Sequence, residues 1–147
     1  MLRQGLNESF SDAHRASVTV ECIELSTRAL RLQGEEQSPD WANLMHARGV
    51  RHLDLARLGL SASLPGGVED IREYQSWLRQ SDAVPEHWRR EVMVAQADVD
   101  VAEFHVLAGE NHLAVALLET AIESMEAGGV PDWMTSRAYG LLDRAGF

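Results

Sequence analysis

Six histidines and one cysteine are the residues of this 147-residue chain best suited to metal binding or nucleophilic chemistry. The histidines show no His-x-x-x-His, His-Glu-x-x-His or Glu-x-x-His spacing, the patterns that place metal ligands on one face of a helix. Cys22 is alone, which excludes an internal disulfide and a cysteine-based zinc site, and its apolar neighbours at helical spacing indicate an inert, buried thiol. There is also no glycine-rich phosphate loop and no Gly-x-Ser-x-Gly motif. The sequence therefore predicts no metal, no cofactor and no catalytic site, and we expect a protein that is not an enzyme.

Arg48 and His52 stand out because they occupy places where an apolar residue is expected. They share one helical stripe with Trp41, Met45 and Leu55. A charge on a packing face is unfavourable unless it finds a partner, so two interpretations remain open. In one, the pair is an internal tie to a carboxylate on a neighbouring helix. In the other, the stripe opens into a groove where Arg48 binds a partner's carboxylate and His52 adds pH sensitivity.

Carboxylates gather in the second half of the chain. Residues 85–130 hold nine Asp and Glu residues against two arginines, and the whole chain carries a net charge of −10. This charge excludes a protein that binds the phosphate backbone of nucleic acids. It would instead attract a basic partner, so we expect an acidic edge to bind a partner together with Arg48 and His52. The residues of this edge are Glu91, Asp98, Asp100, Glu103 and His105.

Three tryptophans reveal an internal repeat. They follow Pro39-Asp40, Pro85-Glu86-His87 and Pro131-Asp132, and these prolines are 46 residues apart. Proline followed by an acid is typical of a helix start, where the missing N–H costs nothing and the carboxylate meets the positive end of the helix dipole. The spacing predicts repeats over 39–84 and 85–130 and a capping helix in 131–147. The tryptophans are expected to pack inside, because they recur at the repeat period.

The elements expected around these motifs are six helices in a single all-α domain over 1–147. An N-terminal helix covers residues 12–33. The first repeat runs helically to Leu58, passes through a loop over 61–67 and continues as a helix from Glu69 to Gln80. The second repeat begins its helix near Pro85, turns at 108–111 and continues to Ala127. The helix near Pro85 carries apolar stripes on two opposite sides, so it must be packed on both.

The second repeat resembles the tetratricopeptide repeat around its helix-to-helix turn. The resemblance lies in the segment Leu107–Val115 and in Leu118 and Ile122 after it. Ala114 and Ala121 stand at the two positions where that family has a small residue. The period of 46 departs from the family's 34. The resemblance implies a right-handed stack of antiparallel helical hairpins. It also implies a protein–protein interaction module that holds a partner peptide or helix on its concave side, as a small acidic chaperone or adaptor. The alternatives are a regulatory sensor that binds a small molecule or signalling peptide between helices, and a helical-bundle enzyme.

The N-terminal helix, residues 12–33, also carries two apolar stripes, although a terminal helix has only one neighbouring layer. Either residues 1–10 fold back with Leu2, Leu6 and Phe10 to cover the second stripe, or the chain curls enough to cover it. Otherwise that stripe is a face for self-association or for a partner. A homodimer through this helix is therefore one of the expected interactions. No run reaches the roughly 20 apolar residues of a membrane span, and residues 1–8 lack the apolar stretch of a leader, so we expect a soluble protein of the cytoplasm.

Overall fold

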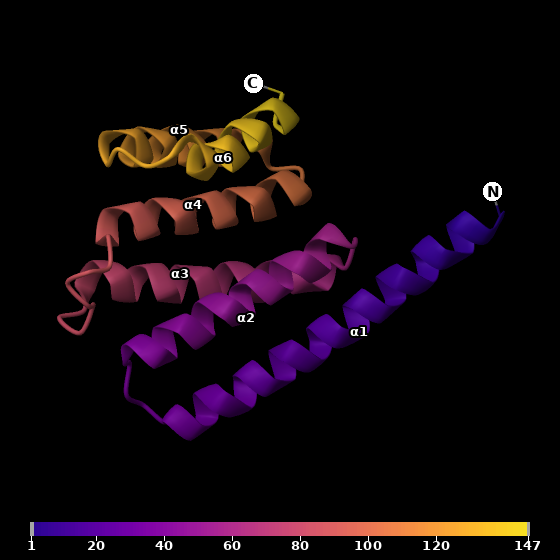
Figure 1. Cartoon of the computed structure of the whole chain (residues 1–147), viewed down its shortest axis with the longest axis horizontal. Coiled ribbons are helices and arrows are strands. Elements are labelled where there is room, and N and C mark those ends of the chain that lie inside the picture. The colour runs from indigo at the N-terminus through magenta and orange to yellow at the C-terminus, as the bar shows by residue number, and fades with distance from the viewer. Residues whose placement is uncertain (1, 147) are drawn as a thin grey trace.

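All regular structure in the described part of the chain is helical, as the sequence predicts (Figure 1). The computed structural model describes the backbone of residues 2–146 and the side chains of residues 11–146. A short 3-10 helix, η1 (Ser61–Ser63), precedes the third helix. The six α-helices are α1 (Leu2–Gln33), α2 (Pro39–Arg57), α3 (Leu64–Gln80), α4 (Arg90–Leu107), α5 (Asn111–Ala127) and α6 (Asp132–Arg144).

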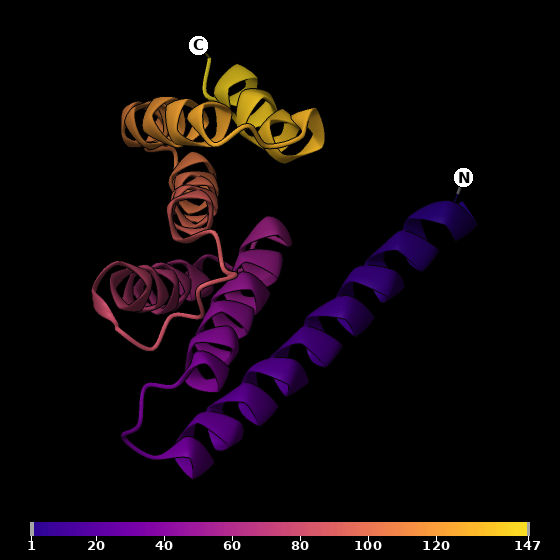
Figure 2. The ribbon, with the colours of Figure 1, turned by 60° about the vertical axis from the view of Figure 1, so that its left-hand side comes forward.

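Each helix packs on the next one in the chain, and α4 also contacts α2 and α6. The helices α2 to α6 form a stacked body, and α1 runs along its outside (Figures 1 and 2). In both views the N-terminal half of α1 extends away from the other helices. Since α2, α4 and α6 are neighbours, they form one layer of the stack, and this layer carries the site described below.

The helix α4 separates two hydrophobic cores, which confirms the prediction of two apolar stripes. Its residues Ala97, Val101 and Phe104 belong to a core shared with α2 and α3. Its other stripe packs into a second core with α5 and α6, through Ala95, Val99 and Ala102. Both stripes are necessary because a helix in the interior of a stack packs against other helices on two opposite sides.

The helix α3 begins earlier than predicted. The sequence indicates a loop through residue 67 and a helix from Glu69, but α3 starts at Leu64. Pro65 lies in its first turn, where proline is tolerated, and the two glycines that follow are helical. Gly67 is buried, and a Cβ atom there would lie 2.2 Å from the Phe104 ring of α4. This glycine therefore allows two helices to approach closely rather than marking a turn.

The helix α4 begins later than predicted, at Arg90 instead of Pro85. Residues 85–88 form a turn in which the Trp88 N–H donates to the Pro85 carbonyl oxygen at 3.0 Å. Trp88 packs edge-on against Trp77 of α3, with ring centroids 5.9 Å apart. The proline–acid–tryptophan motif thus starts a helix at Pro39, where Ser38 caps the Trp41 N–H, but not at Pro85.

The helix α1 is longer than the predicted 12–33. The backbone of residues 2–10 continues the helix and does not fold back over it. The side chains of Leu2, Leu6 and Phe10, proposed as a cover, lie outside the described residues. Among the residues whose side chains are described, Leu25 and Leu32 are 60% and 89% exposed, so the apolar stripe that contains these two leucines is not covered. Among residues 2–146, no helix has the length and apolar character needed to cross a bilayer.

Candidate functional site

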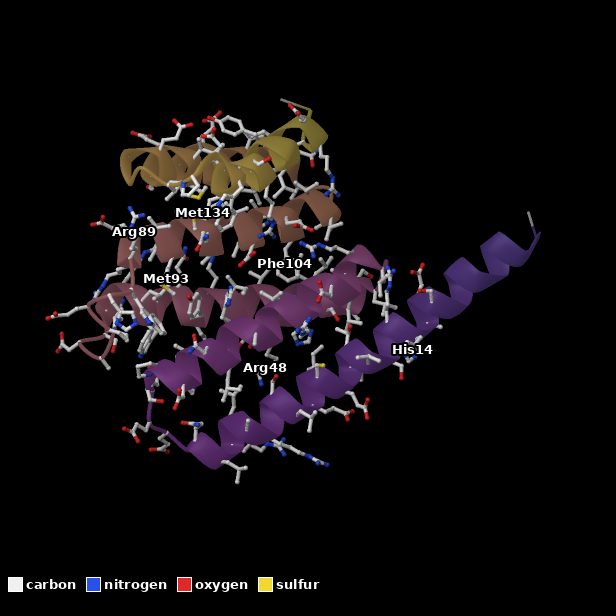
Figure 3. The ribbon with its side chains drawn as sticks, viewed as in Figure 1. His14, Arg48, Arg89, Met93, Phe104 and Met134 are labelled. Carbon is white, nitrogen blue, oxygen red and sulfur yellow. The ribbon has the colours of Figure 1, made fainter. Side chains whose placement is uncertain are left out.

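A groove of about 520 Å³ runs across the layer of α2, α4 and α6. Its walls come from all three helices, with Tyr74 of α3 at its base. Apolar side chains supply much of the surface, among them Val50 of α2, Met93 of α4 and Met134 of α6. Figure 3 shows Met93 and Met134 on different sides of α4. The three helices meet here because α4 packs on both α2 and α6.

A chain of charged groups links the three helices along this layer. Arg137 of α6 donates to Asp100 at 2.6 Å and to Glu103 at 2.9 Å, and both of these carboxylates are on α4. Arg57 of α2 donates to Glu103 as well, with one of its two contacts at 2.7 Å. At the other end, His46 Nε2 of α2 lies 3.2 Å from Asp100. The two carboxylates are thereby buried and neutralised within the chain.

The pKa values of the side chains in this charged network follow from their burial and their partners. Burial alone would raise the pKa of Glu103, but the hydrogen bonds and charges of Arg57 and Arg137 outweigh it and hold that pKa below its ordinary value of 4.5. Burial, together with the charge of Asp100, raises the pKa of Tyr74 to about 12. The phenol at the base of the groove is therefore neutral at physiological pH. His46 stacks beside it, with ring centroids 4.6 Å apart.

Trp133 is the residue of the groove that the sequence interpretation misplaced. The repeat period indicated a packed tryptophan, and Trp41 is indeed 9% exposed. Trp133 is 72% exposed at the start of α6 and lines the groove. It lies in the first turn of α6, and among the described residues the helices α4 and α5, on which α6 packs, leave most of this side chain uncovered. A large exposed aromatic side chain at the edge of an apolar groove is a typical anchor for a partner.

Arg48 and His52 lie outside this groove, on the side of α2 that faces α1 and α3. The two guanidinium nitrogens Nε and Nη2 of Arg48 each donate to Asp70 of α3 at 2.7 Å, and Nη1 donates to Thr27 of α1 at 3.3 Å. Figure 3 places Arg48 between α2 and α1. Of the two interpretations, the internal tie is the one that this geometry matches, since Asp70 is buried and bidentate pairing occupies it.

His52 is half-buried against the first turns of α3. Its imidazole lies 3.6 Å from the position that a Cβ would take at Gly66. Its Nδ1 atom is buried without a hydrogen-bond partner among the described residues. Burial lowers the pKa of His52 below 6.5, and this lowering outweighs the attraction of Asp70. The imidazole is therefore neutral at pH 7.

The remaining residues of the predicted acidic edge are spread over three settings. Asp98 is buried and accepts from Gln75 at 2.7 Å and from Arg72 at 3.1 Å, so it too is used within the fold. Glu91 is exposed in the first turn of α4. His105 lies 3.3 Å from Glu110 across the turn to α5. Of the predicted residues, the structure brings only Asp100 and Glu103 into the charged network with Arg57 and Arg137.

Sequence reasoning missed His46, Arg57 and Arg137 as members of the site. One signal was present: Arg57 and its partner Glu103 are one repeat period of 46 apart, as an arginine and a carboxylate on facing helices would be. No group of three His, Cys, Asp or Glu side chains able to hold a metal ion is found among the described residues. Comparisons with protein-family models, curated proteins and solved structures return no match to the chain.

Proposed function

We propose that this protein is a non-enzymatic interaction module with tetratricopeptide-like stacking, and that it holds a partner peptide or helix in the groove of α2, α4 and α6. The single observation that carries the proposal is Trp133, which is 72% exposed at the edge of an apolar groove. Keeping a side chain of this size in water is unfavourable, and a partner that covers it recovers that free energy. The resemblance of the second repeat to the tetratricopeptide family supports the same use of this layer.

The charges of the groove define the kind of partner. Asp100 and Glu103 are matched by Arg57 and Arg137, and each of these side chains already has hydrogen bonds within the chain. A basic partner would find no free carboxylate in this charge network. We therefore propose an amphipathic partner that inserts an apolar side chain beside Trp133, rather than one held by charge.

A sensor for a small molecule is the second candidate, and the size of the groove favours it. Its volume of about 520 Å³ falls within the usual range for ligand sites of roughly 300–1,000 Å³. A small ligand would raise the melting temperature of the protein, by an amount that grows with the logarithm of the ligand concentration divided by its Kd. A screen of melting temperature against apolar small molecules separates this candidate from a peptide-binding module.

The test uses a library of helical peptides displayed on phage and selected against the whole chain. We expect enriched peptides to bind Trp133→Ala at least roughly thirtyfold more weakly than the native chain, the loss typical of a buried aromatic anchor. Tyr139→Ala is the matched control, because Tyr139 is an exposed aromatic residue of the same helix, 46% exposed, that bonds to Glu126 and does not line the groove. It should leave the affinity nearly unchanged.

If enriched peptides bind Trp133→Ala as tightly as the native chain, the partner does not use this groove and the proposal is wrong. Circular dichroism of both variants checks that each remains helical, so that a loss of affinity reports on contact. Arg48→Ala is not suitable here, since it would leave the buried carboxylate of Asp70 without its partner.

A further inference from the structure

The exposed side of α1 carries a heptad stripe of apolar and small residues. Its members are spaced four, three, four and three residues apart, which keeps them in line along one side of a helix. Leu25 and Leu32 are largely exposed, and Val18 is 43% exposed. Cys22 and Ala29 are half-buried, so the expectation that Cys22 is a buried thiol is wrong. In the described part of the chain α1 packs on α2 alone. Val18 lines a pocket that α1 shares with Asp54 and Arg57 of α2, and no other helix of the described residues covers the stripe. The stripe consists of Val18, Cys22, Leu25, Ala29 and Leu32.

The charge of α1 differs from that of the rest of the chain. Residues 2–33 hold four arginines and four carboxylates, whereas residues 34–147 hold nine arginines and 19 carboxylates. The whole net charge of −10 therefore lies outside α1. Two copies of such a chain repel each other through their bodies, and α1 is the surface on which they can meet without that repulsion.

We propose that two copies of this chain pair through α1 in an antiparallel coiled coil centred between residues 23 and 24. In this register two of the three large residues of the stripe, Val18 and Leu25, each face a small one across the interface. Val18 faces Ala29 of the second copy, and Cys22 faces Leu25 of the second copy; the two-fold axis repeats both pairs. Alternation of large and small side chains is the arrangement that fills such an interface without gaps.

The charges beside the stripe select this direction and this register. Glu21 and Arg28 are seven residues apart and flank the same edge of the stripe. In an antiparallel pair this edge lies along the same edge of the other copy, so Glu21 meets Arg28 of the second copy twice. Sliding the helices by one heptad would bring the two Arg28 side chains together. In a parallel pair, this edge would face Ser26 and Gln33, which carry no charge.

The first test is the oligomeric state of the full chain, measured by sedimentation velocity over a range of concentrations. We expect a reversible dimer, and Leu25→Glu should weaken it by roughly a hundredfold because the two-fold symmetry removes the contact twice. Val20→Glu is the matched control: Val20 is 42% exposed on α1 but lies off the stripe. A native chain that stays monomeric at every concentration would overturn the proposal, as would equal loss with both variants.

The second test determines direction. Glu21→Arg and Arg28→Glu should each weaken the dimer, and the double variant should restore it, because the swapped charges face each other again. In a Cys22→Ser background, Val18→Cys with Ala29→Cys should give a covalent dimer on oxidation. The native Cys22 should not form a covalent dimer. In the proposed register the Cα atoms of its two copies lie more than roughly 7 Å apart, which is too far for a disulfide. Ready linkage through native Cys22, or no rescue by the charge swap, would exclude the antiparallel pair. Neither test involves the groove, so its outcome is independent of the proposed function.

Discussion

Replacing Gly67 by alanine is the sharpest test of how α3 and α4 pack. A Cβ atom at this position would lie 2.2 Å from Cζ and 2.7 Å from Cε1 of Phe104, and 2.9 Å from Cβ of His52. Phe104 is 1% exposed in the core between α3 and α4, so its ring has no free space to enter. The new methyl group therefore forces the two helices apart or drives the ring out of its rotamer.

Two opposing contributions set the magnitude. Alanine in place of glycine inside a helix stabilises by roughly 0.5–1 kcal/mol, through the smaller backbone entropy of the unfolded chain. Overpacking a filled core costs about 1–3 kcal/mol, and a contact more than an ångström too short belongs at the upper end. We expect Gly67→Ala to destabilise the fold by about 2 kcal/mol. For a chain of this size that lowers the melting temperature by roughly 4–8 °C.

The neighbouring glycine supplies the control. At Gly66 a Cβ would meet His52 at 3.6 Å, which is an ordinary contact, so Gly66→Ala should leave stability unchanged or raise it by about 0.5–1 kcal/mol. Urea denaturation followed by circular dichroism measures both variants, and Gly67→Ala with Phe104→Leu should recover part of the loss. If Gly67→Ala is as stable as Gly66→Ala, the close approach of α3 and α4 is wrong.

Three further predictions concern ionisable side chains that the fold partly or fully buries. The pKa of Glu103 is lower in the fold than in the unfolded chain, so its ionised form stabilises the fold fully above pH 4.5, and this stabilisation is lost as the pH falls further. Glu103→Gln should therefore make the free energy of unfolding less dependent on pH on the acid side. The pKa of His52 is also lowered, so stability should fall as the pH drops below 6.5, and His52→Gln should remove that part of the slope. Arg48→Met should destabilise by about 3 kcal/mol in urea titrations, and adding Asp70→Leu should recover most of it, since the carboxylate left alone carries the penalty.

The helical class and the middle of each helix could be predicted from the sequence, because apolar spacing directly reports which sides are packed. The two stripes of α4, through Val101 and Val99, are the clearest example. The beginnings of helices were harder to predict. Pro39 and Pro85 stand in almost the same local sequence, yet only Pro39 starts a helix. Ser38 precedes Pro39 and caps the Trp41 N–H, whereas Val84 precedes Pro85 and has no side-chain oxygen to cap a helix. Trp88 instead packs against Trp77 of α3.

The candidate site could not be predicted in full, because it is formed by contacts between side chains that lie far apart in the sequence. Asp100 and Glu103 were expected to belong to an acidic edge that binds a partner, because polar residues fill the gaps between the apolar stripes of this helix. Their partners come from other helices, with Arg57 46 residues before Glu103 and Arg137 37 residues after Asp100. Trp133 was expected to be packed because its motif recurs at the repeat period, but a repeat period does not show how much of a side chain the neighbouring helices cover.

The internal pairing of the arginines changes the meaning of the net charge. Four carboxylates are buried and form ion pairs with four arginines, Arg48, Arg57, Arg72 and Arg137. The carboxylates are Asp70, Asp98, Asp100 and Glu103. These pairs contribute no net charge, so the acidity of −10 belongs to the remaining carboxylates of residues 34–147, which outnumber their arginines more strongly than the composition suggests. The charge network beside the groove is balanced, and α1 is balanced as well. Attraction of basic molecules and recognition in the groove are therefore properties of different surfaces. Binding in the groove should depend little on salt, whereas any contact with the acidic surface should weaken as salt rises.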